Sequence, residues 1–593
     1  MTKSQIAQVL EEIATLLELK GENPFKIRAY ANAARSLETF GGNLADLHDE
    51  EALAKIPGIG KAIAAKVKEL AGTGKLKYLE ELRAEFPAAI LQLFSISGLG
   101  AKKIKALYEQ LHISSVAQLR EACESGRVAQ LPGFGETTQT KICTAIEQRA
   151  KHSGYFQFGQ IAAETESLRR DLAAHPDGLQ VDVAGSYRRR REIVRDVDLV
   201  VATKEPATIT EFLVKHTLAE SIIAQGPTKT SVRLRSGIQC DLRVVSSAEY
   251  PFALNYFTGS KEHNIEMRSR ALQRGWTLNE YRLARLPPDP KAKKVRAGRG
   301  GRKPATRIPT IRDEADLYRT LGLDFIPPEL RENCGEFEAA EKHSLPRLLE
   351  QDNLHGTFHC HTVASDGHNT LEEMAAAAQE LGLEYLGIAE HSKSSIQAHG
   401  IDAAKLRSQI AAIRKLNKKL DGFRLFAGVE CDILRDGKLD FDDEILSELD
   451  FAVASIHSVF NLSEVEMTKR IIRAMENSLI TILAHPTGRL LLKRDPYLID
   501  VPAVLEAAAA TGTWIELNAA PKRLDLDWRW WPLAKQKGVK CVINPDAHRA
   551  ERLQDLWFGV GIARKGWLTK ADVMNCLPLG KIEMALRAKR EKR

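Results

Sequence analysis

Three patterns of hydrophobic and polar positions follow one another along the chain. Through residues 1–150 apolar residues recur with a period near 3.6, which predicts amphipathic helices. Residues 181–201 alternate apolar and polar side chains, which predicts a strand with one buried face. Beyond residue 350, short apolar runs that end in a polar residue alternate with helical stretches, as in repeated β/α units. The chain is therefore expected to be multidomain, with an all-α N-terminal region, an α+β middle and a β/α barrel at the C-terminal end.

A glycine motif occurs three times in the helical region. The segments IPGIGKAIAAKV from Ile56, ISGLGAKKIKAL from Ile96 and LPGFGETTQTKI from Leu131 each place G-apolar-G before a helix, the arrangement called helix-hairpin-helix. Such a turn aims backbone N–H groups at a phosphate oxygen, whatever the base sequence. A single turn would equally suit a C-capping glycine, but three copies favour DNA backbone binding. The glycines expected to bind DNA are Gly58, Gly60, Gly98, Gly100, Gly133 and Gly135.

Three carboxylates follow on predicted strands. Asp196 and Asp198 lie two positions apart and face the same side of their strand. Asp241, in the β-forming run GIQCDLRVV, is expected beside them. Neighbouring carboxylates repel one another unless a divalent cation lies between them, and two-metal phosphoryl transfer uses such a set.

The turn before these carboxylates has the composition of a phosphate site. Gly185 and Ser186 would let the backbone cradle phosphates, and Arg188–Arg191 would supply positive charge. The alternative is an acidic strand edge with its basic partners. The GS(x9)DxD spacing favours a nucleotidyltransferase.

Seven apolar runs follow residue 350: TFHCH, YLGIAEH, RLFAGVE, FAVASIH, ITILAH, TWIELN and KCVINPDAH. In a β/α barrel the C-terminal ends of the strands meet at one mouth, so polar side chains there converge. A lone histidine after a strand is more often a structural hydrogen-bonding group, but ligand types at nearly every strand end predict a metal centre. The expected ligands are His359, His361, Asp366, His391, Glu430, His457, His485, Asp546 and His548.

Length and composition limit the class of protein. With 593 residues the chain is expected to hold about three to five domains. It is 44% hydrophobic and 27% charged, which argues against a wholly disordered or fibrous chain. No apolar run has the roughly 18 residues of a membrane span, and the first residues are amphipathic rather than a signal peptide, so a cytoplasmic protein is expected. The eight cysteines include no CxxC pair, so buried thiols are expected rather than disulfides or a cysteine zinc site.

Positive charge is concentrated in one segment. From Arg282 to Arg307 ten Lys and Arg accompany one acid, a local charge of +9 in a chain of net charge +7. Frequent Pro and Gly predict a solvated loop or linker. Both a non-specific phosphate contact and a merely solubilising loop fit this segment. Histidine is skewed too, with ten of sixteen beyond residue 340, where metal is expected.

The middle of the chain resembles the family X DNA polymerases, the DNA polymerase beta family. The resemblance rests on the glycine repeats, the carboxylate motif and YFTGSKEHNIEMRSRALQRGWTLNEY from Tyr256. It implies that Asp196 and Asp198 bind both metal ions, Mg²⁺ or Mn²⁺, and that Asp241, the third metal-binding carboxylate, assists deprotonation of the primer 3′-hydroxyl.

The same resemblance assigns nucleotide contacts. Ser186 and Arg189, with Gly185 in the same turn, fall on triphosphate contacts. Other positions match residues that pack against the sugar or touch minor-groove edges: Tyr256, Phe257 and Gly259, then Asn264 and Arg268. Lys261 departs from the acidic residue common at its position, which bears on the strength of nucleotide binding.

In the N-terminal region, Lys66 matches the Schiff-base lysine of the family's lyase domain. The alternatives are a surface lysine on an amphipathic helix and a domain that only binds 5′-phosphates.

The C-terminal part resembles the polymerase and histidinol phosphatase (PHP) domain. Its HxH, SDG, EH, E, H, AHP and DAH elements occur in order in this chain. The resemblance implies three metal ions, Mn²⁺ or Zn²⁺, and phosphoester hydrolysis. His368 and His399 lie near the same loops without an assigned role.

The expected architecture has six parts. They are a lyase-like helical domain (1–80), a fingers-type domain with two hairpin repeats (81–153), a nucleotidyltransferase palm (154–250), a thumb (251–335, basic insert 282–308), a linker (336–352) and a distorted seven-stranded β/α PHP barrel (353–580).

The resemblance as a whole implies a bacterial, nucleoid-associated, monomeric enzyme that binds gapped or nicked duplex DNA and dNTPs. The expected activity is gap filling in base excision repair, coupled to a Mn²⁺-dependent 3′-5′ exonuclease. A phosphoesterase barrel could also support AP endonuclease or 3′-phosphatase activity. The alternatives are a 3′-end-processing phosphoesterase without polymerase activity, a non-enzymatic DNA end-binding scaffold and template-independent nucleotide addition.

Overall fold

The structure is a computed structural model that describes residues 3–39, 53–54, 56, 58–96, 98–152, 154–286 and 308–591. Most of the basic insert predicted at 282–308 lies outside these residues. The chain divides into two compact units, Met1–Ser153 and Gly154–Arg593. No helix among the described residues combines the length and apolarity needed to cross a membrane.

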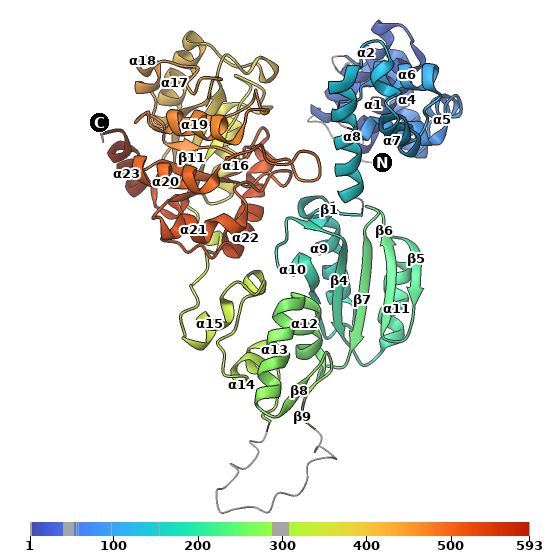
Figure 1. The fold of residues 1–593 in the computed structure, drawn as a ribbon, viewed down its shortest axis with the longest axis vertical. Helices are drawn as coiled ribbons and strands as arrows, with labels where there is room; N and C mark the ends of the chain where they lie inside the picture. The colour runs from blue at the N-terminus through green and yellow to red at the C-terminus, as the bar shows by residue number, and fades with distance from the viewer. Residues whose placement is uncertain are drawn as a thin grey trace, which may run out of the picture. The chain divides into compact units, whose positions relative to one another are not determined.

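The first unit is helical, as its 3.6-residue period predicts (Figure 1). Buried Ile63, Val67 and Leu70 line one face of a helix and show how that period forms the core. The elements are α1 (Lys3–Lys20), α2 (Pro24–Thr39), α4 (Lys61–Thr73), α5 (Lys77–Ala84), η2 (Ala88–Ser95), α6 (Ala101–Leu111), α7 (Val116–Glu124), η3 (Val128–Gln130) and α8 (Gly135–His152).

The second unit begins with a five-stranded mixed sheet in the order β2-β4-β7-β6-β5. Only β4 and β7 are parallel, and the other neighbours are antiparallel. The elements are β1 (Phe156–Gln157), α9 (Phe158–Ala174), β2 (Gln180–Val183), α10 (Gly185–Arg188), β3 (Ile193–Val194), β4 (Asp196–Ala202), α11 (Pro206–Lys215), β5 (Ala219–Gln225), β6 (Lys229–Leu234) and β7 (Gln239–Val245).

The two faces of this sheet have different covers. Val197, Leu199 and Val201 point to one face, where they pack with apolar residues of α9 and α11. Val200 and Ala202 point to the other face and pack against the helix that follows β7. Because side chains alternate along a strand, Asp196 and Asp198 point to this second face as well.

A smaller subdomain follows the sheet. It consists of α12 (Tyr250–Thr258), α13 (Lys261–Gln273), β8 (Trp276–Leu278), β9 (Leu283–Arg285), α14 (Glu314–Thr320), η4 (Pro328–Leu330) and α15 (Glu336–Glu341). Residues 336–352 were expected to form a linker. In the structure α15 buries Phe337 and Ala340 in the core of this subdomain, and Leu349 is buried in the core of the barrel that follows.

The C-terminal part is a barrel of seven parallel strands in sequence order, β10 to β16. The strands are β10 (Gly356–Cys360), β11 (Tyr385–His391), β12 (Arg424–Asp432), β13 (Val453–Ser455), β14 (Ile482–Leu483), β15 (Trp514–Asn518) and β16 (Cys541–Asn544). The seven apolar runs of the sequence become these seven strands, so the predicted fold is confirmed. A bridge between Cys360 and Ala547 nearly closes the barrel between β10 and β16.

Helices surround the barrel (Figure 1). They are α16 (Leu371–Glu380), α17 (Ala403–Asn417), α18 (Asp443–Ser447), α19 (Glu464–Met475), α20 (Val501–Thr511), α21 (Trp531–Gln536), α22 (Leu556–Lys565) and α23 (Leu579–Glu591); the short turns η5 (Gln351–Asn353), η6 (Ile396–Ala398), η7 (Trp528–Trp530), η8 (Ala550–Asp555) and η9 (Met574–Cys576) lie in the loops. Capping boxes start two of them, with Thr370 and Glu373 at α16 and Ser463 and Glu466 at α19.

The barrel interior below the mouth is aromatic and tightly packed. Phe358, Tyr385, Phe426 and Phe451 are buried together. A Cβ at Gly428 would overlap the Phe451 ring, so a glycine is needed for the strands to approach. This plug closes the barrel floor and leaves the C-terminal mouth for polar groups.

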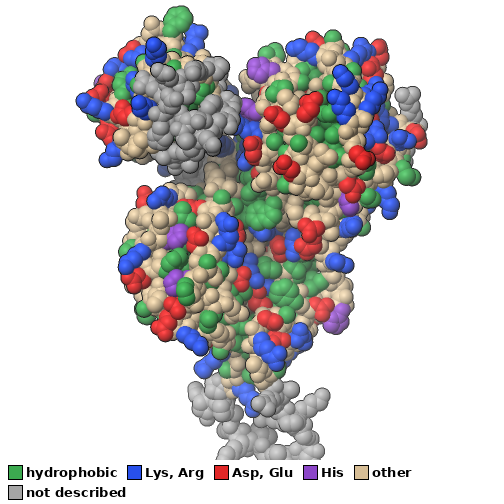
Figure 2. Space-filling view, turned by 180° about the vertical axis from the view of Figure 1, so that it is seen from behind, with side chains coloured by type: hydrophobic (Ala, Val, Ile, Leu, Met, Phe, Trp, Pro, Cys, Tyr) green, Lys and Arg blue, Asp and Glu red, His purple; other side chains and the backbone are tan. Residues whose placement is uncertain are grey.

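The expectation of buried thiols can be checked across the described residues. Six of the eight cysteines are buried thiols, while Cys143 is half-buried and Cys334 exposed. On the face shown in Figure 2, Lys and Arg side chains lie among Asp and Glu side chains rather than in a separate patch.

Candidate functional site

Asp196, Asp198 and Asp241 lie together on one face of the five-stranded sheet. In the parallel pair β4 and β7, Asp198 is the direct partner of Asp241. Asp196 lies two residues earlier on β4 and faces the same side. The strand register thus brings together the carboxylates that the sequence indicated.

Burial and mutual repulsion disfavour charge on two of these carboxylates. Burial, followed by the charges of Asp196 and Asp241, raises the pKa of Asp198 to about 7. Burial and the charge of Asp241 also raise the pKa of Asp196. Burial acts in the same direction on Asp241, but hydrogen bonds from Lys229, Ser231 and Gln239 hold its pKa below the usual value. A cluster of carboxylate oxygens whose negative charges repel one another fits a divalent cation with oxygen ligands, Mg²⁺ or Mn²⁺.

The turn at Gly185 is built around Asp198. Gly185 has φ of 63° and starts α10, and a Cβ at this position would overlap the Asp198 carboxylate. The backbone N–H of Ala184 donates to the Asp198 carbonyl at 2.7 Å. Ser186, predicted to contact phosphate, is the next residue in the same turn.

Two arginines after this turn are held by carboxylates. Arg188 donates to Glu314 and to the Thr258 hydroxyl, each at 2.7 Å. Arg189 donates from Nη1 to the Thr258 carbonyl at 2.6 Å and from Nε to Glu332 at 3.1 Å. Both guanidinium groups are thereby fixed against the start of the thumb-like subdomain.

Arg190 has a different environment. Its guanidinium lies 4.1 Å from the ring centroid of Trp557 and 5.3 Å from that of Phe158. Burial lowers its pKa. The four arginines were expected to supply charge to a phosphate site together, but Arg190 is turned by a φ of 55° into this aromatic pocket.

The α12–α13 junction carries the other predicted nucleotide contacts. The rings of Tyr256 and Phe257 meet edge to face with centroids 5.2 Å apart. Asn264 donates from Nδ2 to the Tyr256 carbonyl at 2.7 Å, and Arg268 donates to the Asn264 carbonyl at 3.3 Å. Gly259 adjoins this group, and the structure gathers these residues around one junction.

Gly259 also links this junction to the phosphate turn. A Cβ there would lie 3.2 Å from Nη1 of Arg189. The structure thus brings the predicted sugar-contacting segment next to the predicted triphosphate-contacting arginine.

In the N-terminal unit, the first glycine of each hairpin turn has the same left-handed backbone, while the second glycine is extended at Gly60 and Gly100 and left-handed at Gly135. Gly58, Gly98 and Gly133 have φ of 87°, 86° and 85°. Gly60 and Gly100 are the N-caps of α4 and α6, and Gly135 is the first residue of α8. Each turn therefore delivers a helix N-terminus, the geometry expected for a phosphate contact.

Lys66 lies on α4. Its ammonium donates to the Ala62 carbonyl at 3.3 Å and lies 4.9 Å from the centroid of the Tyr78 ring. The lysine is half-buried beside an aromatic face, so it is not simply a solvated surface lysine.

The polar strand ends of the barrel converge at its mouth. His359 on β10, His391 on β11 and Glu430 on β12 lie at or near the C-terminal ends of adjacent strands. Glu430 contacts five imidazoles: Nε2 of His359 at 3.2 Å, Nε2 of His361 at 3.7 Å, Nδ1 of His391 at 2.7 Å, Nε2 of His457 at 3.2 Å and Nε2 of His485 at 3.0 Å.

All nine predicted ligands fall into groups compact enough to hold an ion. The four groups are His361, Asp366, His391 and His548; His359, His485 and Asp546; His359, His361 and Glu430; and His391, Glu430 and His457. Mixed imidazole and carboxylate donors fit Mn²⁺ or Zn²⁺ better than Mg²⁺.

Several buried polar atoms in this cluster make no hydrogen bond of acceptable geometry, although some lie within 4 Å of an oppositely charged group. They are Nε2 of His359, both ring nitrogens of His361, Oδ1 of Asp366, Nδ1 of His391 and Oε2 of Glu430. Buried polar atoms are rarely left without a partner, and unpaired ligand atoms that converge are what a metal centre requires. The residues present therefore fit bound metal ions.

Comparisons with known proteins agree with this geometry. Family models match a helix-hairpin-helix domain at residues 1–76, a SAM-like helix-hairpin-helix tandem at 90–148, a DNA polymerase beta thumb at 253–332 and a PHP domain at 357–519. DNA polymerase/3′-5′ exonuclease PolX of Bacillus subtilis (strain 168) is 38% identical over 589 residues, 99% of this chain and 100% of that protein. The chain belongs to the family X DNA polymerases with a PHP domain. The resemblance indicated by the sequence motifs is thereby confirmed.

The PHP part of this family X polymerase also has separate relatives. A probable phosphatase of Thermoanaerobacter sp. (strain X514) is 30% identical over 246 residues, 40% of this chain and 95% of that protein. A probable phosphatase of Caldanaerobacter subterraneus subsp. tengcongensis is 32% identical over 203 residues, 32% of this chain and 74% of that protein.

Two carboxylates that hydrogen-bond to predicted ligands of the PHP part were not among the predicted site residues. Glu516 accepts from Nδ1 of His359, and Asp432 accepts from Nδ1 of His457, each at 2.6 Å. Such bonds fix the ring so that its other nitrogen faces the ion. The polar residue inside the apolar run TWIELN was a signal for Glu516.

Arg523 is a further residue that sequence analysis missed. It follows β15, and its side chain is 13% exposed, with Nε 3.6 Å from Oδ2 of Asp546. Its Nε and Nη1 are buried without hydrogen-bond partners. A buried guanidinium beside the ligand cluster, with donors to spare, suits a substrate phosphate.

His368 is placed beside the cluster through its backbone, whose N–H donates to the His548 carbonyl at 2.8 Å. His399 follows the short turn η6 with φ of 53°. Neither belongs to the ligand groups found among the described residues.

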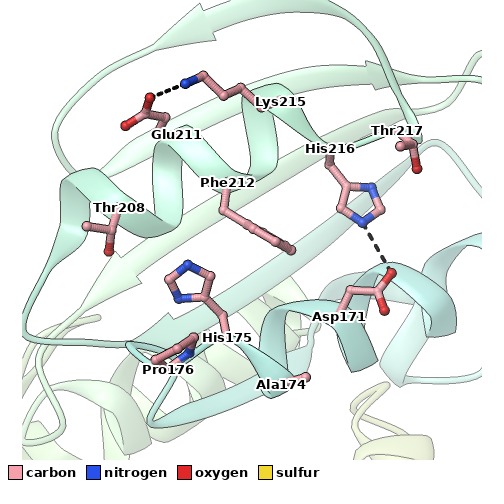
Figure 3. Close-up of a pocket in the computed structure, with 10 residues that line it drawn as sticks. All are labelled: Asp171, Ala174, His175, Pro176, Thr208, Glu211, Phe212, Lys215, His216 and Thr217. Carbon is pink, nitrogen blue, oxygen red and sulfur yellow. Dashed lines mark hydrogen bonds and ion pairs between the residues drawn. The ribbon is translucent and has the colours of Figure 1, made fainter.

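A pocket of about 750 Å³ between α9 and α11 contains none of these residues (Figure 3). Its lining includes His175, Phe212 and His216, and His216 pairs with Asp171 at 3.2 Å. The candidate chemistry is therefore carried by the carboxylate cluster of the five-stranded sheet and by the imidazole and carboxylate cluster of the barrel, and not by this pocket.

Proposed function

We propose that this protein fills short gaps in duplex DNA as a DNA-directed DNA polymerase in base excision repair, and trims primer ends as a Mn²⁺-dependent 3′-5′ exonuclease. The observation that carries the proposal is the presence of two separate, complete ligand clusters on one chain. The name of the Bacillus subtilis relative, DNA polymerase/3′-5′ exonuclease PolX, supports both activities.

In the polymerase site, Asp196 and Asp198 would hold the metal ions, and Asp241 would accept the proton of the primer 3′-hydroxyl. Bound divalent ions supply Lewis acidity that favours the ionised hydroxyl and neutralises the triphosphate. Its oxygen-only donors favour Mg²⁺ or Mn²⁺. Because its pKa is held below the usual value, Asp241 stays ionised and free to accept a proton.

Neighbouring side chains orient the nucleotide. Ser186 and Arg189, with Gly185 in the same turn, bind the triphosphate, and the Thr258 carbonyl and Glu332 fix the Arg189 guanidinium. The remaining contacts lie at the α12–α13 junction: Tyr256, Phe257 and Gly259 pack against the sugar, and Asn264 and Arg268 meet the minor-groove edges.

In the PHP site, the nine imidazole and carboxylate ligands would hold three ions, Mn²⁺ or Zn²⁺. Bound ions there supply a water nucleophile of lowered pKa and stabilise negative charge on the phosphate. Arg523 donates its free N–H groups to a phosphate oxygen. Glu516 and Asp432 hold their histidines in one tautomer.

The helical unit binds DNA through the three hairpin turns, and its partners are gapped or nicked duplexes and their 5′-phosphates. Lys66 is proposed as the nucleophile of an abasic-site lyase. Reduction with borohydride in the presence of a 5′-abasic duplex would trap such an adduct on the wild type and not on Lys66→Met.

Primer extension and shortening on one DNA substrate test the proposal. A 5′-labelled primer on one-nucleotide-gapped DNA is incubated with Mn²⁺, with and without dNTPs. We expect Asp198→Ala to abolish extension alone and His361→Ala to abolish shortening alone. A wild type that shortens but never extends the primer would remove the polymerase half of the proposal.

The probable phosphatases that match the PHP part favour a second activity, removal of a 3′-phosphate. The same assay with a 3′-phosphorylated primer measures it. His361→Ala should block this activity, and AP endonuclease activity can be measured on a duplex with an internal abasic site.

A further inference from the structure

One face of α22, a helix of the PHP part, is packed against the phosphate turn of the palm. Trp557, Gly561 and Lys565 recur at intervals of four residues, so they share this face. Trp557 stacks on Arg190 at 4.1 Å, and a Cβ at Gly561 would lie 3.2 Å from Cδ of the same arginine. Lys565 donates to the Arg189 carbonyl at 3.0 Å. The helix therefore holds two consecutive residues of the turn.

Lys565 is buried and fully engaged. Its side chain has 0% exposure, and besides the Arg189 carbonyl it donates to the Glu329 carbonyl at 3.3 Å and to the Glu332 carboxylate at 2.6 Å. Burial lowers its pKa to about 8, against the opposing effect of Glu332. Burying an ammonium in this way is costly, and an apolar residue of similar volume often stabilises such a position better. Stability alone therefore gives little reason for this lysine.

Glu332 carries the connection to the nucleotide site. Its Oε1 accepts from both Lys565 and Nε of Arg189, and its Oε2 lies 3.7 Å from Arg191. Since Glu332 is only 12% exposed, water cannot readily replace the lysine. The direction of the Arg189 guanidinium thus depends on where Lys565 holds the shared carboxylate.

We propose that Lys565 is a positioning residue for the polymerase reaction, which acts through Glu332 and the Arg189 backbone to aim Arg189 at the triphosphate of the incoming dNTP. This inference rests on the proposed role of Arg189. Without the lysine, Glu332 is left with the two arginines alone, and it draws Arg189 away from the nucleotide. The carbonyl of Arg189 also loses its anchor.

Steady-state gap filling by the full chain tests the proposal. Lys565→Met, similar in length but uncharged, should raise the KM for dNTP about tenfold, with kcat reduced less and with shortening of the primer unchanged. Unchanged shortening shows that the PHP part is folded.

Arg564→Met is the matched control. Arg564 neighbours Lys565 and joins the same two parts of the chain through Glu329 and Glu350, but no contact links it to Arg189 or Glu332. Its KM for dNTP should match the wild type. An equal rise in both variants would mean that any loosening of the contact has this effect, and it would overturn the proposal.

A double-mutant cycle separates positioning from general damage. In an Arg189→Met background, Lys565→Met should cause no further rise in KM, because its path to the nucleotide is already broken. An additive rise would overturn the proposal. If the single variant folds poorly, the double variant Lys565→Met with Glu332→Gln replaces it, because it leaves no unpaired acid. This double variant should also raise the KM for dNTP. A wild-type KM in the double variant would overturn the proposal. A wild type that never extends primers would instead remove the proposed function itself.

Discussion

The ammonium of Lys229 lies 2.6 Å from Oδ2 of Asp241, the carboxylate paired across the sheet with Asp198. Lys229 is on β6 and reaches the cluster from the neighbouring strand. A fixed cation thus lies at the position where a divalent ion would share the same oxygen, and the two compete for it.

We predict that Lys229→Met lowers the Mg²⁺ concentration for half-maximal extension. The change should be at most about fivefold, because a partly exposed ion pair contributes about 0.2–1 kcal/mol. Removing the lysine also raises the pKa of Asp241. The pH at which the extension rate begins to fall on acidification should therefore be higher in the variant. Titration of Mg²⁺ in gap filling measures the first effect, and the exposed Lys204→Met is the control. A higher Mg²⁺ requirement would contradict the competition.

Gly185→Ala should abolish extension and spare primer shortening. The added Cβ overlaps the Asp198 carboxylate, and φ of 63° adds strain. Displacing a reacting group by about 1 Å can cost on the order of 100-fold in rate. Gly275→Ala is the matched control, because Gly275 has φ of 77° but open space around its Cβ position. Equal losses of extension in both variants would show that strain alone is responsible.

Arg523→Met should slow primer shortening about 100- to 1,000-fold, the usual cost of losing a donor to a developing oxyanion. Bound metal, measured by elemental analysis of the purified protein, should stay at the wild-type level, and extension should not change. The exposed neighbour Lys522→Met provides the control. Loss of metal from Arg523→Met would indicate that the arginine supports the ligands rather than the substrate.

The thumb-like subdomain should lose stability in acid through His263. This imidazole is completely buried between Glu336 at 2.9 Å and Tyr318 at 2.8 Å. Burial, aided by the charge of Arg331 and opposed by Glu336, lowers its pKa to about 4. The unfolded state then binds the extra proton between pH of about 6.5 and 4, so stability falls by up to about 1.4 kcal/mol per pH unit as pH decreases through that window.

Hydrogen exchange of the amides in α13 and α15 measures this effect locally. These helices contain none of the predicted metal ligands, so the titration of those ligands does not enter the measurement. The wild type should lose protection in these helices as pH decreases from 7 to 5, after correction for the intrinsic exchange rate. His263→Gln lacks the titrating group and should lose less. The same slope in both proteins would assign the acid sensitivity to another group.

The sequence predicted the parts of the fold that depend on local periodicity. Seven apolar runs became seven strands, and the alternation around Asp196 and Asp198 placed both on one face of β4. Ligand types at strand ends were recognisable because barrel topology alone brings those ends together.

Residues whose role depends on packing between distant segments were not predictable. Four consecutive arginines look equivalent in sequence, yet Arg190 turns into an aromatic pocket completed by Trp557, 367 positions later in the printed sequence. Arg523 and Lys565 likewise resemble ordinary surface cations until the tertiary structure buries them. No periodic pattern encodes such long-range contacts.

Each of the four ligand groups at the barrel mouth has a member in common with another group: His359, His361, His391 and Glu430 each belong to two. A substitution at Glu430 therefore removes a ligand from two metal sites at once. Because the sites share ligands, they cannot be occupied independently of one another. The activity of the nuclease half is accordingly expected to be either retained or lost as a whole when one shared ligand is substituted. A lineage that loses one shared ligand has little to gain from keeping the others, so decay of this centre should be abrupt rather than gradual.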